Sequence, residues 1–533
     1  MEDPASSATA DNPPNSVMWY SVLAFFLPVL LLLFHRHFSR NKLNYLPPPG
    51  PKPWPLIGNL NLLGEHLHLS FHSLSQKYGP LMQLKLGLNI MVVCSSAEVA
   101  ELFLKTHDLT FATRPEILAG KHANYDYLVM PGAPYGPHLR QTRKIYKTEL
   151  LSPKRLAQFE YMRVEERKAF MCKLYKLSSS SYSTPVHLKE CVFMFNLAIM
   201  SRMLFGKRYT EENENNVVTP KELTEIVEEV FFLSGVLDIG GAIPWLAFLD
   251  LQGNVKRMKA ARKKIDKFYE HVLDEHERHG KRKFKERGTN DMVDVLLQLA
   301  DDPTLEVKLE RDQEIILRHR CSNSSLSYQS KHHEYNYQEW TMSELLKNPE
   351  VIQKATDELD RVIGRSKWVE EKDIVNLPYI QAIVKEVMRL HPPLPCLVPH
   401  KARENCKVAG YDIVKNSRIV VNVWAIGRDP TLWEKPNEFY PERFIGKEID
   451  VIGRNFELLP FGSGRRMCVG YALGLKMVQS TLANLLHGFE WKLPGDMKKE
   501  DLDMEEISGG STTRKNPLLV VPKPRLPLDL YSV

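Results

Sequence analysis

The chain has 533 residues, 43% of them hydrophobic and 26% charged, which is enough to build a large globular core. Its formal net charge of +6 is small and spread along the sequence, so nucleic acid is not indicated as a partner. The seven cysteines are scattered and form no CxxC pair, which excludes a secreted disulfide scaffold and favours reduced thiols in the cytosol.

An apolar run of 18 residues, from Val17 to Phe34, is just long enough to cross a bilayer. A cleaved signal peptide is the alternative, but residues 1–16 contain no Lys or Arg and no small-residue cleavage site follows the run. Basic residues come after it, and the positive-inside rule then places the short N-terminus in the lumen and the body in the cytosol. The sequence therefore predicts one retained transmembrane helix at 17–34.

A basic and proline-rich hinge, residues 35–58, follows the predicted anchor. Its run Leu46-Pro-Pro-Pro-Gly-Pro-Lys-Pro-Trp-Pro55 favours an extended, semi-rigid backbone, so we expect a stiff spacer between the membrane and the body. The remaining residues, 59–533, form the predicted globular body.

Within the body, helical periods outnumber strand patterns. Residues 82–86 alternate apolar and polar side chains, a glycine turn follows at 87–89, and 90–93 are apolar, which predicts a β-hairpin. The basic run 256–287 is most simply a solvated helix and loop. Residues 376–391 predict an amphipathic helix, and another helix is expected after Gly470, ending near His487. The apolar face of the helix at 376–391 comprises Ile380, Ile383, Val384, Val387 and Leu390.

The segment 461–470 reads Phe-Gly-Ser-Gly-Arg-Arg-Met-Cys-Val-Gly and places Cys468 directly before the second of these helices. Glycines let a backbone approach a flat ligand, the N-terminus of the following helix favours a thiolate, and the arginines can pair with carboxylates. A glycine turn with a buried thiol is one alternative. A phosphate loop is another, but its Gly-Lys-Ser/Thr ending is absent. We interpret Cys468 as a ligand of iron.

This segment resembles the haem-binding signature of the cytochrome P-450 monooxygenases, Phe-x-x-Gly-x-Arg-x-Cys-x-Gly. The matching positions are Phe461, Gly464, Arg466, Cys468 and Gly470. Two more family elements occur in the expected order: Glu386-x-x-Arg389 in the predicted helix, and Pro-Glu-Arg-Phe around Arg443. In the family, this glutamate and both arginines form a buried network that holds the segment before the cysteine.

The resemblance implies a mostly α fold with a minor β region and one haem b (iron protoporphyrin IX), with the Cys468 thiolate as its proximal ligand. Phe461, Gly464, Arg466 and Gly470 would cradle the haem. Arg143 and His400 would bind its propionates, the alternatives being a surface arginine and a strand-end histidine. Leu139 stands where many members carry a tryptophan, so one propionate hydrogen bond would be lost.

The resemblance also implies an enzyme of the endoplasmic reticulum membrane that uses O2 and electrons from an NADPH-dependent reductase. Plant microsomal members, which oxidise terpenoids, phenylpropanoids or alkaloids, are the most similar. The stretches 135–150 and 243–253 look similar to the group that holds the homoterpene synthases, including trimethyltridecatetraene synthases. By family position the substrate pocket, suited to a lipophilic molecule, would include Phe111, Pro395, Cys396, Leu397, Ser508 and Thr512.

Residues 312–339 depart from the family pattern. The segment has no glycine, no acid–Thr pair for oxygen activation and no amphipathic period, although residues 340–346 match the family again. A shifted reading frame or misjudged exon boundary is the favoured explanation. A divergent helix in which Ser324 or Ser325 replaces the hydroxyl is a second, and a functional insertion is a third. The alternative function is then a catalytically impaired haem-binding relative.

Overall fold

The computed structural model describes the backbone of residues 45–179, 185–210, 218–286, 291–300, 325–507, 509 and 511–532. Side chains are described over the same ranges except 279–286, 300 and 325–334. The chain divides into two units, Met1–Pro47 and Pro48–Val533, and the second contains everything that follows. The predicted lumenal segment 1–16 and anchor 17–34 lie outside the described residues. Among the helices that the structure does describe, none is both long and apolar enough to cross a membrane.

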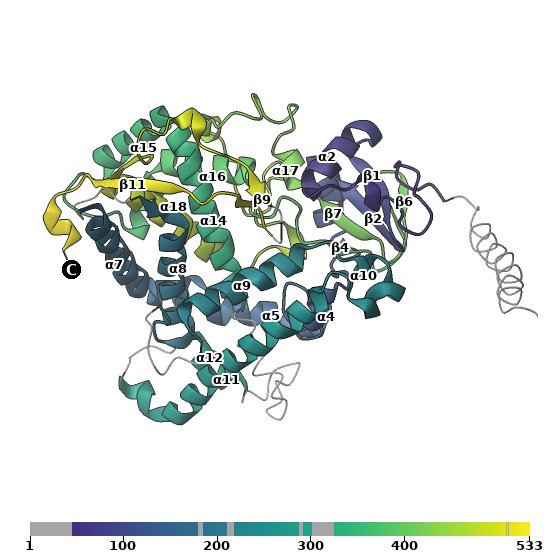
Figure 1. The fold of residues 1–533 in the computed structure, drawn as a ribbon, viewed down its shortest axis with the longest axis horizontal. Helices are drawn as coiled ribbons and strands as arrows, with labels where there is room; N and C mark the ends of the chain where they lie inside the picture. The colour runs from purple at the N-terminus through teal and green to yellow at the C-terminus, as the bar shows by residue number, and fades with distance from the viewer. Residues whose placement is uncertain are drawn as a thin grey trace, which may run out of the picture. The chain divides into compact units, whose positions relative to one another are not determined.

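Helices make up most of the second unit (Figure 1). They are α2 (Leu67–Tyr78), α3 (Ala97–Glu101), α4 (Leu118–His122), α5 (Pro137–Ile145), α6 (Pro153–Gln158), α7 (Glu160–Ser179), α8 (Leu188–Phe205), α9 (Pro220–Gly235), α10 (Ile239–Ala242), α11 (Asn254–Glu286), α12 (Met292–Ala300), α14 (Ser325–Lys347), α15 (Pro349–Val362), α16 (Pro378–Leu390), α17 (Val423–Ile426) and α18 (Tyr471–Gly488). Short helical turns include η4 (Pro244–Leu249), η6 (Pro441–Phe444), η7 (Gly464–Arg466) and η9 (Leu528–Tyr531).

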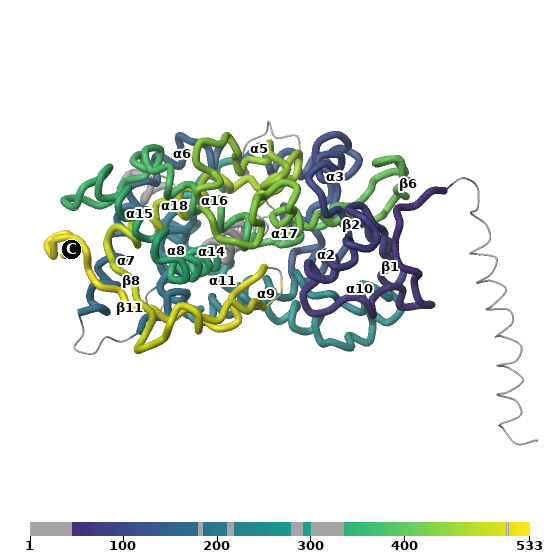
Figure 2. The backbone as a smooth tube through the Cα atoms, turned by 90° about the horizontal axis from the view of Figure 1, so that it is seen from above, coloured from purple at the N-terminus to yellow at the C-terminus, as the bar shows by residue number. Residues whose placement is uncertain are grey.

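The strands are few and short. They are β1 (Leu81–Leu86), β2 (Asn89–Cys94), β3 (Val186–His187), β4 (His400–Lys401), β5 (Cys406–Val408), β6 (Tyr411–Ile413), β7 (Arg418–Val421), β8 (Phe489–Lys492), β9 (Glu506–Ile507), β10 (Thr513–Arg514) and β11 (Leu519–Pro524). The β1-β2-β7-β4 sheet lies at one end of this unit, and the β3-β11-β8 sheet lies at the other, beside α7 (Figures 1 and 2).

The predicted hairpin is confirmed. Strands β1 and β2 pair antiparallel from Leu81↔Cys94 to Leu86↔Asn89, and β2 then pairs parallel with β7. Alternate side chains of β2 enter different apolar clusters, Val92 on one face and Val93 on the other. Because both faces are covered, the sheet forms a rigid platform for the segments that follow it.

The two predicted helices are also confirmed. The first is α16, and its five predicted apolar residues are all buried. The second is α18, which begins at Tyr471 and ends at Gly488. The basic run is a helix as predicted, but α11 continues without a loop to Glu286, the last residue described there.

Residues 325–339 belong to α14, so this part of the segment without a period is helical. Helix α14 packs against α8, α16 and α18, and Tyr335, Tyr337 and Trp340 are buried. A helix that is covered on several sides needs no polar face, and its sequence therefore shows no amphipathic period. This is why the sequence pattern did not reveal a helix there.

Candidate functional site

The loop that carries Cys468 is a tight turn between the core and the N-terminus of α18. The Cys468 N–H donates to the Phe461 carbonyl oxygen over 2.9 Å, and the backbone turns at Gly462 and Gly464 with φ of 67° and 66°. Glycine adopts this left-handed conformation without steric cost. A Cβ on Gly464 would also lie 2.2 Å from the Leu104 carbonyl oxygen, so this position has no room for a side chain.

The Cys468 side chain faces a cavity and is exposed towards it. Burial in the protein raises the pKa of its thiol, which the N–H of Gly470, the charge of Arg143 and the N–H of Tyr471 lower in part. These partners favour the thiolate, and a metal ion would complete its deprotonation. The sulfur is thus placed as a metal ligand at the start of a helix.

The cavity is partly open to solvent, and the empty space inside it and at its mouth together amounts to about 1750 Å³. Its wall is formed by the cysteine loop, by apolar residues of α8, α12 and α18, and by four basic residues. Lining residues include Arg114, Arg143, Met292, Val293, Leu296, Tyr337, Met388, Pro393, Leu394, Leu397, Val398, His400, Arg466, Cys468 and Val478. Such a space, with a thiol on one wall and mostly apolar sides, suits a large flat ligand.

Four basic side chains meet at this cavity. Arg143 donates to the Met467 carbonyl oxygen over 2.9 Å, and Arg114 donates to the Val398 and Pro399 carbonyl oxygens. The other two basic residues, Arg466 and His400, form hydrogen bonds with backbone oxygens of the segment 111–133. Arg466 donates to the carbonyl oxygens of Ala112 and Ala133, and the His400 Nδ1 lies 2.8 Å from the Phe111 oxygen.

No carboxylate balances these charges among the described residues that line the cavity. Burial, followed by the charges of Arg466 and Arg143, holds the pKa of Arg114 well below its usual value. Burial and Arg143 lower the pKa of Arg466 to about 9, and burial and Arg114 hold the pKa of His400 well below its usual value. Buried cations that repel one another call for an anion. The two propionates of haem fit this requirement.

Arg114 was not predicted from the sequence. It is a single arginine between Thr113 and Pro115, and only the fold brings it to Arg143 and Arg466, which are far away in the sequence. The signal that remains in the sequence is the proline that follows it, because an X-Pro pair holds the arginine backbone extended.

The predicted network of Glu386, Arg389 and Arg443 is assembled. Glu386 accepts from Arg389 over 2.7 and 2.8 Å and from the Arg443 Nε over 3.1 Å, and the remaining guanidinium N–H groups donate to backbone carbonyls. All three side chains are buried. Two buried arginines share one carboxylate, and their remaining N–H groups are hydrogen-bonded to backbone carbonyls, so the network ties α16 to η6 with its polar groups satisfied.

The predicted substrate positions are placed differently. Among the described residues of this set only Leu397 lines the cavity, together with Pro393, Leu394 and Val398. Phe111 packs edge-on against Phe103, the backbone of Cys396 forms an isolated β-bridge with that of Asn422, and neither residue is in the described lining of the cavity. Pro395 is also absent from the described lining.

The last pocket candidates lie at the C-terminal side. Thr512 is buried and donates to the Pro392 carbonyl oxygen over 3.2 Å, and it is not in the described lining of the cavity. Ser508 and Ser324 lie outside the described residues, and only the backbone of Ser325 is described, as the first residue of α14. The two serines of the divergent-helix hypothesis therefore stay a prediction.

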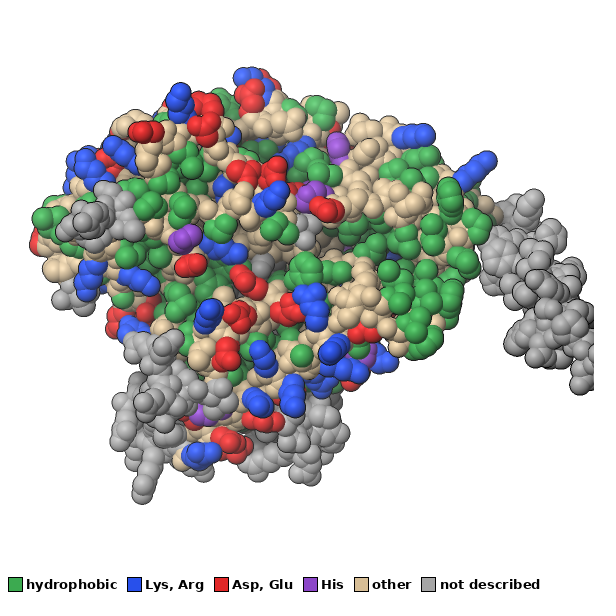
Figure 3. Space-filling view, viewed as in Figure 1, with side chains coloured by type: hydrophobic (Ala, Val, Ile, Leu, Met, Phe, Trp, Pro, Cys, Tyr) green, Lys and Arg blue, Asp and Glu red, His purple; other side chains and the backbone are tan. Residues whose placement is uncertain are grey.

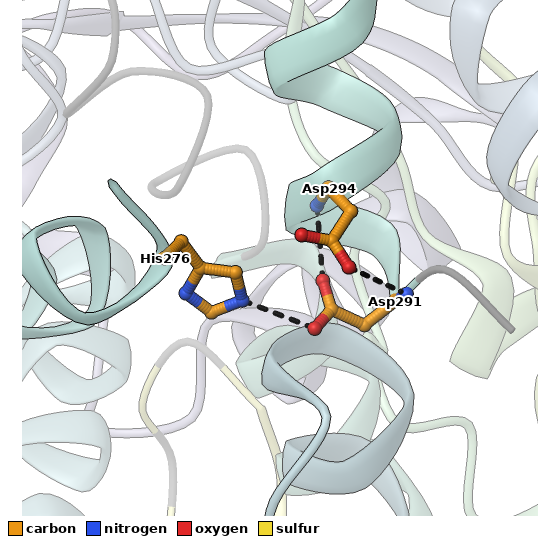
Figure 4. A group of neighbouring side chains, drawn as sticks. All are labelled: His276, Asp291 and Asp294. Carbon is orange, nitrogen blue, oxygen red and sulfur yellow. Dashed lines mark hydrogen bonds and ion pairs between the residues drawn. The ribbon is translucent and has the colours of Figure 1, made fainter. Parts of the chain in front are cut away.

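Helix α12, which contributes Met292, Val293 and Leu296 to the cavity, is anchored at its N-terminus (Figure 4). Asp291 and Asp294 each accept the other's backbone N–H, and the His276 Nε2 on α11 lies 3.0 Å from Asp291. Burial lowers the pKa of His276, but the hydrogen bond and charge of Asp291 outweigh burial and raise it above the usual value. The result is an ion pair that fixes one wall of the cavity.

The family model described as Cytochrome P-450 matches residues 48–319 and 336–521. The unmatched interval, 320–335, lies inside the predicted departure at 312–339, so residues 312–319 and 336–339 fall within the matched ranges and the departure is narrower than predicted.

Similar proteins come from plants. Trimethyltridecatetraene synthase from Zea mays is 42% identical, with 96% of this chain and 94% of the relative aligned. Dimethylnonatriene synthase from Zea mays is 41% identical, with 91% and 92% aligned. Flavonoid 3'-monooxygenase from Arabidopsis thaliana is 39% identical over 96% of this chain and 98% of its own length.

Two solved structures of a zebra fish cytochrome P-450, one with abiraterone and one with progesterone, share the fold. Each has a TM-score of 0.69 and covers 86% of this chain, with 99% and 100% of the other chain aligned, at 22% and 23% identity. The expected mostly helical fold with small sheets is confirmed.

Proposed function

The chain belongs to the cytochrome P-450 family, and on that premise we propose that it oxidises a lipophilic plant secondary metabolite, a terpenoid or a phenylpropanoid. As a family member it is a haem b monooxygenase that receives electrons from a reductase. The observation that carries the proposal is the placement on one cavity of Cys468 and three arginines, with His400 beside them and no carboxylate in the described lining.

In this proposal each part of the cavity has a separate role. Cys468 holds the iron, and the N–H groups at the start of α18 stabilise its sulfur. Arg114, Arg143 and Arg466, with His400, bind the two propionates and so fix the orientation of the ring. Bound haem supplies the one-electron and O2 chemistry, while the protein positions the substrate.

The substrate class is inferred from the apolar wall. Met292, Leu296, Leu394 and Leu397 offer hydrocarbon contacts and exclude water, which suits a terpenoid or a flat phenolic. The similar plant proteins are named trimethyltridecatetraene synthase, dimethylnonatriene synthase and flavonoid 3'-monooxygenase. A terpene alcohol is our first candidate, because the first two of these relatives share the higher identity.

A catalytically impaired relative is the second candidate. Its support is the described part of α14, residues 335–347, in which Thr341 is buried and donates to the Tyr337 carbonyl oxygen instead of facing the cavity. In that case haem binds at Cys468, but electron flow couples poorly to product.

We also propose that the body contacts the endoplasmic reticulum membrane from the cytosolic side. Besides the apolar run at 17–34, an exposed apolar rim supports this proposal. The rim comprises Leu88, Trp245, Phe248, Leu249 and Leu251, which are between 49% and 82% exposed. The Leu88 N–H donates to the Ala242 carbonyl oxygen, which joins the β1–β2 turn to α10, and hydrophobic side chains gather on this side in Figure 3. Such a rim suits an interfacial contact.

Two measurements test the function. Full-length protein should give a reduced carbon-monoxide difference band at about 450 nm, the mark of thiolate-bound haem, and Cys468→Ser should abolish it. Reconstituted with reductase and NADPH, the protein should convert at least one compound from a panel of terpene alcohols and flavonoids. A haem spectrum that is the same in Cys468→Ser would refute the proposal, and a normal spectrum with no product would favour the impaired relative.

A further inference from the structure

The exposed surface of α11 is basic over residues 254–267. Every exposed residue in this range is Lys or Arg, except Ala260. Asp266 is the only acidic residue of the range, and it is half-buried and accepts the Tyr125 hydroxyl. The helix therefore presents cations to solvent with no exposed carboxylate among them, and Lys and Arg side chains gather along its course in Figure 3.

One flank of this surface is neutralised by α9. Arg257 pairs with Glu229 over 2.6 Å, and Lys264, two turns further along the same flank, interacts through its charge with Glu222. These two cations already have acidic neighbours, so they are not available for another anion.

The outward face of α11 carries a lysine stripe without such neighbours. Its members follow one another at intervals of three and four residues, which places them on one side of the helix, opposite the buried Met258 and Phe268. Within the described part of the chain, the ion pairs of 254–267 belong to Arg257 and Arg262, and none involves the stripe. The lysine stripe comprises Lys256, Lys259, Lys263 and Lys267.

The lysine stripe begins where the apolar rim ends. The last residue of the rim precedes the first lysine of the stripe by five residues, and Asp250 links the two. Its carboxylate accepts the N–H groups of Val255 and Lys256, each over 3.0 Å, and Asn254 donates to Asp238, the N-cap of α10. Because the start of α11 is bonded to this loop and to α10, rim and stripe form one fixed surface.

A membrane in contact with the rim would lie within electrostatic reach of the stripe. With a helical rise of about 1.5 Å per residue, Lys263 lies about 10 Å beyond Lys256, close to the Debye length of about 8 Å in physiological salt. Anionic lipids of a cytosolic leaflet attract basic side chains at this range, and apolar and basic contacts together bind more firmly than either alone. The exposed aromatic and leucine side chains beside the stripe favour a lipid surface over an acidic protein.

We propose that the lysine stripe of α11 binds the headgroups of anionic phospholipids, so that the body docks preferentially on negatively charged membranes. The inference rests on the membrane contact proposed above for the rim, and it adds the class of lipid. Lys256, Lys259 and Lys263 lie nearest the rim along the helix and carry most of the effect.

The test is lysine footprinting of the full-length chain in phosphatidylcholine nanodiscs with and without phosphatidylserine. An acylating reagent modifies exposed lysines, and mass spectrometry follows the rate at each position. Lys256, Lys259 and Lys263 should react about fivefold more slowly when phosphatidylserine is present at low salt, and high salt should remove this protection.

Three lysines of α7 serve as the internal control. Lys168, Lys173 and Lys176 are exposed on a helix that lies beside the β3-β11-β8 sheet, at the other end of the unit from the β1–β2 turn (Figure 1). Their reaction rates should be the same in both kinds of nanodisc.

A pair of variants repeats the comparison without chemical modification. In wild type, phosphatidylserine should slow hydrogen exchange of the rim segment 244–251 roughly tenfold. The combined Lys256→Gln, Lys259→Gln and Lys263→Gln variant should lose this gain. The matched control, in which glutamine replaces the three α7 lysines, loses the same charge and should behave like wild type.

Equal reactivity of the stripe lysines with and without phosphatidylserine would overturn the proposal, as would equal protection of the α7 lysines, which would mean a non-specific charge effect. Protection that requires added reductase would make the stripe a protein-docking face and would overturn it too. If 244–251 is protected in phosphatidylcholine and phosphatidylserine adds nothing, only this inference falls. If 244–251 is unprotected in both nanodiscs, the proposed membrane contact falls with it.

Discussion

The Glu386 Oε1 lies 3.1 Å from the Arg443 Nε, 57 residues later in the chain, and both side chains are buried. The same oxygen accepts the Tyr440 N–H over 2.8 Å. A single carboxylate thus ties α16 to the segment that leads towards the cysteine loop.

Glu386→Gln should therefore be strongly destabilising. It leaves the guanidinium groups of Arg389 and Arg443 buried without a counter-charge, which costs about 3–5 kcal/mol in the free energy of unfolding. Urea unfolding measures the loss. Glu438→Gln, which removes the carboxylate of an exposed pair with Lys435, should cost about 1 kcal/mol or less. Similar losses in the two variants would contradict the importance of the network.

Gly464→Ala should lower haem content. An alanine in this left-handed backbone conformation costs about 1–2 kcal/mol. Its Cβ would also overlap the Leu104 carbonyl oxygen, which should displace the loop before Cys468. Gly446→Ala is the control, because Gly446 also has a positive φ, of 72°, but no atom lies within 4 Å of the added Cβ. Haem per protein should fall in the first variant only. Equal haem content in both variants would speak against this steric role.

The ion pair of His276 and Asp291 should make stability depend on pH. Because the folded-state pKa of His276 is raised, its contribution is complete below the unfolded value of about 6.5 and is lost as pH rises through the folded value. Asp291→Asn keeps a side-chain acceptor for the helix N-terminus but removes the charge. We expect it to cost roughly 1–3 kcal/mol at pH 6 and clearly less at pH 9, measured by urea unfolding. If the difference in unfolding free energy between wild type and Asp291→Asn grew with pH, the assigned upward shift of the His276 pKa would be wrong.

The apolar rim should bind lipid independently of residues 17–34. A variant that lacks 17–34 should still sediment with phospholipid vesicles in high salt. Replacing Trp245 and Phe248 by serine should weaken this partition by about 2 kcal/mol, or roughly 30-fold. The control replaces Val375 and Leu528, which are 75% and 63% exposed outside the rim. An equal loss in the control would show that the rim has no special role.

Local patterns revealed much of this fold. Cys468 and its glycines form one short motif, and the apolar period of α16 is continuous, so both were predictable. The residues that line the cavity were not predictable, because the backbone conformation decides which side chains of a segment face the cavity. Cys396 pairs with Asn422, and its neighbours Leu394 and Leu397 face the cavity instead.

Long-range placement explains the other differences. Arg114 acquires its meaning only beside Arg143 and Arg466, and no local pattern marks it as part of a charge cluster. Tyr337 lies in a helix that is covered on several sides, where polar and apolar residues carry no period. A helical period is visible in a sequence only when one face of the helix is buried and the other is exposed. A helix that is buried on all sides shows no such period.

The parallel pairing of β2 with β7 joins Met91 to Arg418. A ribosome adds about 5–20 residues per second, so the partner of β2 emerges on the order of 20–60 s after it. During synthesis the β1–β2 hairpin therefore waits with one apolar edge unpaired, and such an edge is a template for aggregation. The nascent chain should depend on chaperones until β7, at about four fifths of its length, has been translated.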